Sequence, residues 1–340
     1  MNNHDEILKK LKNENMEWGD FEYLLTLNEN QMEPFYKFAQ ELTSKNFKNQ
    51  LKIYVPGKQF PAISVTGTDC ALHCEHCNKK YLRGMKKITD TEDLESFLIN
   101  HFQKGGVGAL ISGGCDSNGS VPLKDFVKSI QKVKKKTKLV INTHTGLLDE
   151  ETAKGLAKAK IDIISFDINM DEEIIRNIYH LEKDLDNYKE AVGILKKNNL
   201  NIVPHICVGL LYGKLNKEIE SLRFIKEMKI NPSLIVIIAL IPPKSEKFVN
   251  PDANDIGKII AITRFIFPKT EISLGCMRPR KKERIEIEKT AIKAGINRLE
   301  IPSKYTLRWV KKKFPNRIIK TFSACCAIPE KLEELAELKE

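Results

Sequence analysis

Short runs of apolar, often β-branched residues alternate along this chain with longer segments in which apolar residues recur at helical spacing. Runs of this kind predict buried strands, and the longer segments predict amphipathic helices that connect one strand to the next. We therefore expect parallel strands with helical crossovers. The eight predicted strands are residues 62–65, 109–112, 139–142, 161–166, 202–207, 234–241, 271–274 and 297–301.

The clearest predicted helix lies between the first two of these strands. Thr89 and Glu92 have the spacing of a capping box, in which two side chains satisfy free backbone N–H groups at a helix start. Leu94 and Leu98 then fall on one face of the helix, and Gly105 follows its end. Amphipathic segments of the same kind follow the later strands.

Eight strand–helix units predict an α/β fold of the (β/α)8, TIM-barrel-like type. A doubly wound open sheet fits the same alternation, but a barrel leaves no strand edge unpaired and suits a chain of 340 residues. We divide the chain into an N-terminal helical extension (1–50), a barrel core (51–305) and a C-terminal helical tail with a Cys–Cys pair (306–340). In either topology the chemistry should lie at the carboxyl ends of the strands.

The composition narrows the class of protein. The longest apolar run, 234–241, is far shorter than the roughly 20 residues that span a bilayer, and the polar N-terminus does not resemble a secretory signal. We expect a cytoplasmic protein that does not enter a membrane. The net charge of +11 would suit an acidic partner, but the lysine runs lack interleaved aromatic residues, so we do not expect nucleic acid to bind.

Three of the eight cysteines, Cys70, Cys74 and Cys77, lie within eight residues directly after the first predicted strand. Thiolates select iron–sulfur clusters or zinc, and three of them leave one metal position open for another ligand. A buried stripe of cysteines on a helix has the same spacing, but the neighbouring residues are too polar for one. Zinc completed by His73 or His76 is the stronger alternative.

The spacing Cys-x3-Cys-x2-Cys after a first strand resembles the signature of the radical S-adenosylmethionine (SAM) superfamily. The resemblance implies a radical SAM (β/α) barrel in which Cys70, Cys74 and Cys77 bind a 4Fe–4S cluster, and SAM chelates the fourth iron. It further implies reductive cleavage of SAM to methionine and a 5′-deoxyadenosyl radical, which abstracts a hydrogen from the substrate. His76 departs from the aromatic residue that many members carry before the last cysteine.

Residues at the later strand ends match places where the family binds SAM. Gly113 and Gly114 resemble the glycine turn whose backbone contacts the methionine amino group, although Cys115 separates them from the acidic Asp116. Polar pairs at two-residue spacing, such as Asn142 with His144 or Ser165 with Asp167, share one face of a strand and suggest a lined pocket. The SAM-binding residues implied are Gly113, Gly114, Asp116, Asn142, Asp167 and Gly209.

The remaining cysteines exceed what one cluster needs. We predict a second iron–sulfur cluster from Cys115, Cys276, Cys325 and Cys326, while plain buried or surface thiols are the alternative. In addition, the guanidinium groups of two arginines that follow Cys276 could bind a carboxylate of SAM or substrate. These are Arg278 and Arg280.

Residues 50–305 look most like the biotin-synthase-related archaeal radical SAM proteins, one branch of which forms a two-component lipoyl synthase. In biotin and lipoyl synthases an auxiliary cluster is consumed as the sulfur source. Bacterial lipoyl synthases place its cysteines upstream of the SAM motif, whereas here the first cysteine is Cys70.

The resemblance implies sulfur insertion into an octanoyl chain on a protein lysine or lipoyl domain. The implied partners are ferredoxin or flavodoxin as electron donor, a second radical SAM subunit and an acidic lipoyl carrier protein. Two alternatives stay open: another radical SAM reaction in cofactor biosynthesis or RNA modification, and a non-enzymatic zinc-binding nucleic-acid module.

Overall fold

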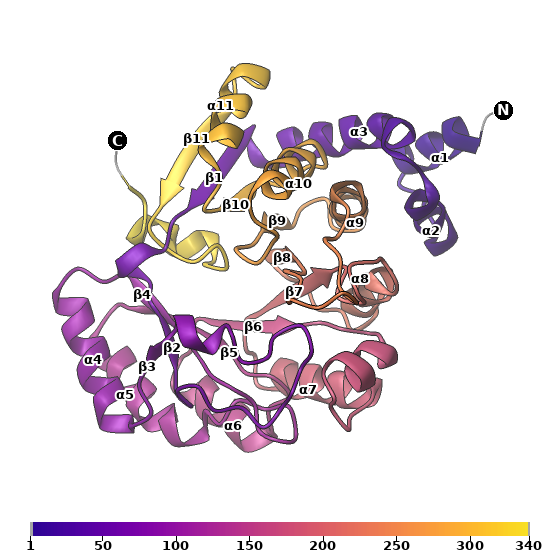
Figure 1. Cartoon of the computed structure of the whole chain (residues 1–340). Coiled ribbons are helices and arrows are strands. Elements are labelled where there is room, and N and C mark those ends of the chain that lie inside the picture. The colour runs from indigo at the N-terminus through magenta and orange to yellow at the C-terminus, as the bar shows by residue number, and fades with distance from the viewer. Residues whose placement is uncertain (1–2, 339–340) are drawn as a thin grey trace.

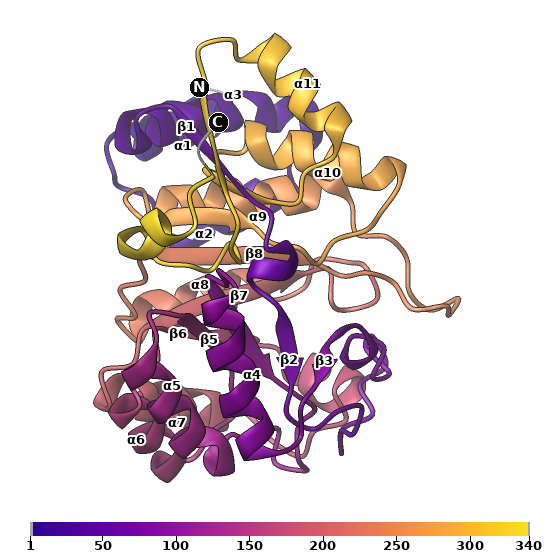
Figure 2. The same ribbon diagram turned by 90° about the vertical axis from the view of Figure 1, so that its left-hand side faces the viewer.

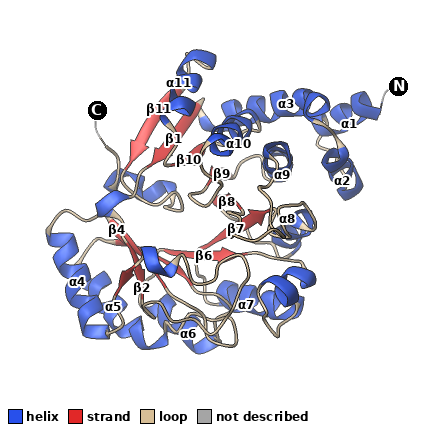
Figure 3. Cartoon of the chain, viewed as in Figure 1, coloured by secondary structure: helices blue, strands red, loops and turns tan. Residues whose placement is uncertain are grey.

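The computed structural model describes residues 3–338, and the fold is built on one curved parallel sheet (Figures 1 and 3). Its eleven strands lie in the order β11-β1-β10-β9-β8-β7-β6-β5-β4-β2-β3. The strands are β1 (Gln50–Tyr54), β2 (Ala62–Ser64), β3 (Lys86–Lys87), β4 (Gly108–Ser112), β5 (Val140–His144), β6 (Ile163–Asp167), β7 (Ile202–Val208), β8 (Leu234–Ala239), β9 (Glu271–Leu274), β10 (Arg298–Glu300) and β11 (Ile318–Phe322).

The eight predicted strands are confirmed as β2 and β4 to β10, and each lies next to its sequence neighbour in the sheet. The sheet curves into a partial barrel rather than a closed ring (Figure 1). The reason is that β1 pairs with the outer edge of β10 and the short β3 pairs with the outer edge of β2, so the two edges that an eight-stranded ring would join are already occupied. The α/β barrel class is therefore right, and only the closure differs from the expectation.

Helices cover the outer face of the sheet (Figures 1 and 2). Asp90, not Thr89, caps the helix α4, because its carboxylate accepts hydrogen bonds from the N–H groups of Glu92 and Asp93. None of the helices in residues 3–338 is both long and apolar enough to cross a bilayer. The helices are α1 (Asn3–Lys12), α2 (Trp18–Thr26), α3 (Glu29–Phe47), α4 (Thr91–Gln103), α5 (Val127–Lys136), α6 (Glu150–Lys158), α7 (Leu185–Lys197), α8 (Glu218–Glu227), α9 (Ala253–Ile266), α10 (Lys282–Lys293) and α11 (Lys304–Lys313).

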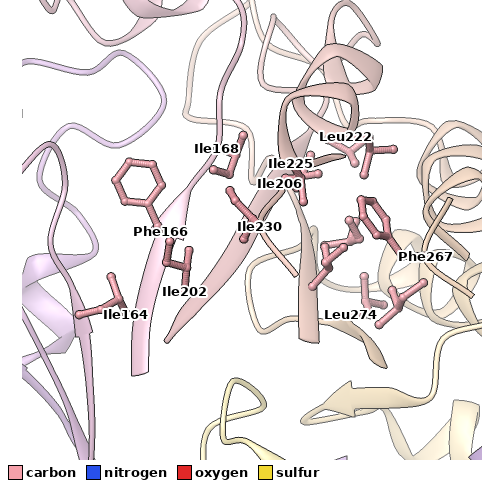
Figure 4. Packing of buried hydrophobic residues seen from close by; sticks show 14 of the residues in the cluster. Ile164, Phe166, Ile168, Ile202, Ile206, Leu222, Ile225, Ile230, Phe267 and Leu274 are labelled. Carbon is pink, nitrogen blue, oxygen red and sulfur yellow. The ribbon is translucent and has the colours of Figure 1, made fainter. Parts of the chain in front are cut away.

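Apolar residues cover both faces of the strands, which is why the strands read as continuous apolar runs. On the outer face, Phe166 and Ile206 belong to the large core between strands and helices, as do Leu222 and Ile225 of α8 (Figure 4). On the inner face, a second core joins strand residues such as Val140, Ile163, Val203 and Leu234 to Ala324, Ala327 and Ile328 of the C-terminal segment. The C-terminal segment therefore packs inside the partial barrel.

The C-terminal segment differs from the helical tail expected for residues 306–340. After α11 it forms β11, which pairs with β1 at the edge of the sheet, and then a short 3-10 helix, η5 (Glu330–Leu335). Phe322 of β11 stacks on Tyr54 of β1, with ring centroids 5.1 Å apart. A strand at this position needs a partner 268 residues upstream, so local sequence does not reveal it.

A buried network of ion pairs fixes the C-terminal segment to the strands. Lys52 of β1 lies 2.9 Å from both Glu271 of β9 and Glu333 of η5, measured between Nζ and carboxylate oxygens. Arg298 of β10 pairs with the same two carboxylates. The hydroxyl of Tyr54 donates a hydrogen bond to Glu333. Two cations and two carboxylates thus balance in a site from which water is excluded.

We predict that Glu333→Ala destabilises the protein by about 3–5 kcal/mol, because it leaves Lys52 and Arg298 with one buried carboxylate between them. Urea unfolding measures the loss. The control is Glu330→Ala, which removes a 77% exposed carboxylate 3.4 Å from the same Lys52 and should cost less than about 1 kcal/mol. Equal effects of the two substitutions would contradict a stabilising role for the network.

Candidate functional site

The three closely spaced cysteines lie in the loop that follows β2. The loop turns tightly, since the N–H groups of Cys77 and Asn78 both donate to the carbonyl of Cys74. Asn78 adopts a positive φ of 42°, which such a turn requires. The Cys74 thiol lies 3.5 Å from the carbonyl oxygen of Tyr179, in the segment after β6. Contacts within the loop and to this second segment hold the cysteines in place.

The three thiols lie within electrostatic range of one another. Burial, together with the charges of Cys77 and Cys70, raises the pKa of Cys74 to about 12. Burial also raises the pKa of Cys77, and the charge of Cys70 adds to the increase. Three thiolates in this space would repel one another unless a cation joins them. A metal centre supplies that positive charge, so the donor set fits a cluster bound through three thiolates.

The turn after β4 packs directly on this loop. The backbone N–H of Cys115 donates to the Cys70 sulfur at 3.3 Å, and the N–H of Ala71 donates to the carbonyl of Cys115 at 2.7 Å. Gly114 donates its N–H to the hydroxyl of Thr66 at 2.7 Å. A Cβ on Gly114 would lie 2.0 Å from the carbonyl oxygen of Asp69, so only glycine allows this approach. The predicted glycine turn and the cysteine loop therefore form one unit.

Polar residues follow on the inner face at the next strand ends. The hydroxyl of Ser165 donates to Asn142, whose own Nδ2 has no hydrogen-bond partner among residues 3–338. Asp167 at the end of β6 lies 3.7 Å from Nδ1 of His144, and the ring of His205 lies 5.1 Å from that of His144. Desolvation would raise the pKa of Asp167, but His144 and His205 hold it below its ordinary value. The site thus offers a free amide donor and a carboxylate.

Asp116 and Gly209, also predicted to bind SAM, have local structural roles as well. Asp116 is exposed, and its Oδ1 accepts hydrogen bonds from the N–H groups of Asn118 and Ser120, which shapes the turn after Cys115. Gly209 has a φ of 76° and donates its N–H to Glu218 at 2.9 Å. A Cβ on Gly209 would lie 2.7 Å from Pro251, so the position needs glycine whether or not it contacts a ligand.

The structure divides the four cysteines predicted to bind a second cluster. Cys115 lies beside Cys70, and burial and the charges of Cys70 and Cys74 raise its pKa to about 12. It therefore belongs to the first site, and its grouping with Cys276, Cys325 and Cys326 is corrected. Those three follow β9 and β11, and Cys276 and Cys325 are both close enough to raise the pKa of Cys326.

Arg278 does not serve the predicted carboxylate-binding role. Its guanidinium is buried and pairs with Glu288 of α10 at 2.6 Å, and it also donates to the carbonyls of Gly275 and Glu300. These contacts occupy the N–H donors of its guanidinium and hold the loop after β9 in place. Arg280 is exposed, so it stays a candidate for binding an anion.

Glu300 was missed by the sequence analysis. Its carboxylate lies within 4.8 Å of the sulfur atoms of Cys325 and Cys326, so it joins the second group of cysteines. Arg298 and Glu300 have the two-residue spacing of the other polar strand pairs, and that signal could have placed Glu300 on the inner face.

We predict that Gly114→Ala lowers the metal content of the anaerobically reconstituted protein by more than half, because the new methyl group displaces Asp69 and Cys70. Iron and sulfide analysis measures the loss. Gly84→Ala is the matched control, since its Cβ would meet no atom within 4 Å, and it should bind as much metal as the unmodified chain. Full metal content in Gly114→Ala would contradict the packing argument.

His205 should make stability depend on pH. Burial and the charge of His144 lower its pKa from 6.5 to about 4, although Asp167 opposes the shift. Between pH 6.5 and pH 4, His205 is protonated in the unfolded chain but not in the folded chain. The free energy of unfolding therefore falls as the pH falls from 6.5 towards 4. At pH 5 the loss attributable to His205 is on the order of 2 kcal/mol.

Urea unfolding at pH 7 and pH 5 checks this expectation. His205→Asn should lose less stability between the two pH values than the unmodified chain does. His180→Asn, which replaces an exposed histidine, should behave like the unmodified chain. If His205→Asn shows the full pH dependence, the buried ring is not its source.

Comparisons with known proteins agree with this site. The family model described as the radical SAM superfamily matches residues 64–225, which contain the cysteine loop and the strand ends up to β7. A biotin synthase of Buchnera aphidicola subsp. Baizongia pistaciae is 26% identical over 269 residues, which cover 75% of this chain and 74% of that protein. A biotin synthase of Coxiella burnetii is 27% identical over 186 residues, covering 52% of this chain and 56% of that one.

Solved structures share the fold. Methylornithine synthase aligns with a TM-score of 0.61 at 19% identity, covering 84% of this chain and 82% of its own. The FeFe-hydrogenase maturase HydG from Carboxydothermus hydrogenoformans aligns with a TM-score of 0.67 at 14% identity, covering 97% and 81%. The match of residues 64–225 to the radical SAM family model argues against the alternative of a non-enzymatic zinc module. The sequence matches and the cysteine loop at the mouth of a partial barrel show that residues 64–225 form a radical SAM domain, with biotin synthases among the relatives of this chain.

Proposed function

We propose that this enzyme uses a radical derived from SAM to insert sulfur into an aliphatic chain, namely an octanoyl group carried on a protein lysine or lipoyl domain. The observation that carries the proposal is the meeting of Cys325 and Cys326 with Glu300, whose sulfur and carboxylate atoms lie within 4.8 Å of one another, while Cys276 is close enough for its charge to raise the pKa of Cys326. Thiols beyond those of the SAM motif are what a sulfur-inserting enzyme needs for a second cluster. Biotin synthases among the relatives support the same class of reaction.

In this proposal Cys70, Cys74 and Cys77 hold the 4Fe–4S cluster. When bound, the cluster supplies the electron that cleaves SAM to methionine and a 5′-deoxyadenosyl radical. The N–H of Cys115 donates to the Cys70 sulfur, and a hydrogen bond to a thiolate tunes the reduction potential of the cluster it binds. Gly114 lets the turn approach the backbone of Asp69 and Cys70 in the cysteine loop.

The inner strand ends would orient SAM and substrate. The unpartnered Nδ2 of Asn142 can donate a hydrogen bond, and Asp167, held ionised by His144 and His205, can accept one from a hydroxyl or ammonium group. Below these residues, Val140, Ile163 and neighbouring apolar side chains pack against the C-terminal segment. Such packing would keep a reactive radical away from water.

The proposed reaction also requires partner proteins. A ferredoxin or flavodoxin would deliver the electron, and a second radical SAM subunit and an acidic lipoyl carrier protein would complete the system. Arg280, Lys281 and Lys282 are exposed together where the loop after β9 enters α10, and this basic surface would attract an acidic carrier. Eight thiols without a disulfide among residues 3–338 suit a reducing compartment, so we place the protein in the cytoplasm.

The test is SAM cleavage by anaerobically reconstituted protein under a strong reductant. The unmodified chain should form 5′-deoxyadenosine, and Cys70→Ala/Cys74→Ala/Cys77→Ala should form none, because no thiolates remain to hold the cluster. Glu330→Ala, a surface change, should retain the activity. Cleavage by the triple variant would contradict the assignment of the cluster site.

The finer proposal is tested with an octanoylated lipoyl domain as substrate. Mass spectrometry should detect sulfur in the octanoyl group, formed together with 5′-deoxyadenosine. Formation of 5′-deoxyadenosine without a sulfur-bearing product, with the partner subunit present, would instead favour another radical reaction in cofactor biosynthesis or RNA modification.

A further inference from the structure

The stretch of chain that follows the cysteine loop is strongly basic. Residues 76–89 contain four lysines and one arginine, and the first acidic residue after them is Asp90. The carboxylate of Asp90 caps α4, where it accepts hydrogen bonds from two N–H groups. None of the five basic side chains pairs with a carboxylate among residues 3–338, whereas Lys132 and Lys136 of α5 both pair with Glu95. The positive charge of this stretch is therefore not neutralised within the described chain.

The basic residues lie against the loop that holds the three cysteines. Lys80 is part of the turn, since its N–H donates to the carbonyl of Cys77 at 3.0 Å. After the short 3-10 helix η2 (Leu82–Gly84), the chain forms β3, which ends the sheet on this side (Figure 2). The side chain of Lys87 in β3 packs on the cysteine loop, because a Cβ on Gly67 would lie 2.8 Å from its Cε.

Most of these side chains are open to solvent. Arg83, Lys86 and Lys87 are exposed, and Lys79 is half-buried. The ammonium of Lys86 lies 4.8 Å from the centroid of the Phe97 ring of α4, so an aromatic face positions it without a carboxylate. The four residues Lys79, Arg83, Lys86 and Lys87 form a continuous basic segment of the surface, the basic edge.

Two simpler roles account for the basic edge less well. Lysines at the edge of a sheet commonly prevent pairing with another strand, but Lys79 and Arg83 lie outside any strand. Single-stranded nucleic acid needs open aromatic rings on which bases stack. Tyr81 is the one Phe, Tyr or Trp residue of the stretch, and the ammonium of Lys80 covers a face of its ring at 4.9 Å from the centroid. The basic edge therefore suits an acidic protein surface.

The position of the basic edge indicates which acidic protein it suits. Cys70, Cys74 and Cys77 are each only partly buried, so a cluster bound to them lies close to the surface. Reductive cleavage of SAM needs one external electron for each SAM consumed. Because electron transfer between proteins slows steeply with distance, the donor has to bind beside this loop.

We propose that the basic edge is the docking surface for a small acidic electron-transfer protein that reduces the cluster. In the complex the donor loses one electron, the 4Fe–4S cluster gains it, and no proton or group passes between them. Opposite charges attract over about 10 Å at 0.1 M salt, so the basic edge would both speed the encounter and orient the donor. The choice of partner rests on the proposed function, since a donor is needed only if the chain cleaves SAM.

Charge reversal tests the proposal, with a fully reduced flavodoxin as the donor. In the anaerobically reconstituted protein, Arg83→Glu/Lys86→Glu should raise the flavodoxin concentration for half-maximal SAM cleavage at least about tenfold, because the acidic donor is then repelled. High salt should narrow the difference from the unmodified chain. Lys87 is left unchanged, since it packs on the cysteine loop.

Two controls separate docking from damage to the site. Dithionite is a small reductant that needs no docking surface, so with dithionite Arg83→Glu/Lys86→Glu should form 5′-deoxyadenosine as fast as the unmodified chain. Lys311→Glu/Lys312→Glu makes an equal change of charge on exposed residues of α11, at the other end of the sheet (Figures 1 and 2). This variant should shift the half-maximal flavodoxin concentration by less than about twofold, because salt screens distant charges.

The proposal is overturned if Arg83→Glu/Lys86→Glu accepts electrons from flavodoxin as well as the unmodified chain does, or if Lys311→Glu/Lys312→Glu loses as much. It is also overturned if the first variant loses binding of an RNA oligonucleotide while its flavodoxin kinetics stay unchanged.

Failure of the proposed function gives a different result, because the unmodified chain then forms no 5′-deoxyadenosine even with dithionite. Calorimetric titration of the cluster-loaded protein with flavodoxin still tests the basic edge in that case. The unmodified chain should bind flavodoxin, and Arg83→Glu/Lys86→Glu should bind it at least about tenfold more weakly. Equal binding by the two proteins would overturn the docking surface alone.

Discussion

The ion pairs among Lys52, Glu271, Arg298 and Glu333 are the interaction on which the rest of this structure depends. They join β1, β9 and β10 to the C-terminal 3-10 helix, and so they hold the last segment of the chain inside the partial barrel. Each ion would be costly to bury alone, but the two cations and two carboxylates compensate one another. This arrangement does more than stabilise, because it determines which residues line the interior.

The interior consists of two halves with different chemistry. On the side of β2, β4, β5 and β6, the cysteine loop, the Gly114 turn, Asn142 and Asp167 form the radical SAM site. On the side of β9 and β10, the C-terminal segment brings Cys325 and Cys326 to Glu300. Apolar residues at the starts of the strands, such as Val140 and Ile163, pack against the C-terminal segment.

The sequence predicted those parts of the structure that depend on neighbouring residues in the chain. Strands buried on both faces read as apolar runs, and the motif of Cys70, Cys74 and Cys77 needs only eight residues, so both could be found without the fold. The strands β1 and β11 were not predicted, because a lysine interrupts the apolar run of each one and each pairs with a strand far away in the sequence. Arg278 was assigned to a ligand because Glu288, its partner, lies on a helix whose orientation no local pattern gives. Glu300 was missed although its two-residue spacing from Arg298 matches that of the other polar strand pairs.

The central claim is that three thiolates of the loop after β2 hold a cluster whose remaining iron is open to SAM. Electron paramagnetic resonance of the reduced protein, recorded with and without SAM labelled with ¹⁵N at the amino group, tests it most directly. The account predicts that SAM changes the spectrum of one cluster and that a coupling to the labelled nitrogen appears, with both effects absent when Cys70, Cys74 and Cys77 are replaced. A reduced cluster whose spectrum is unchanged by SAM would contradict the account.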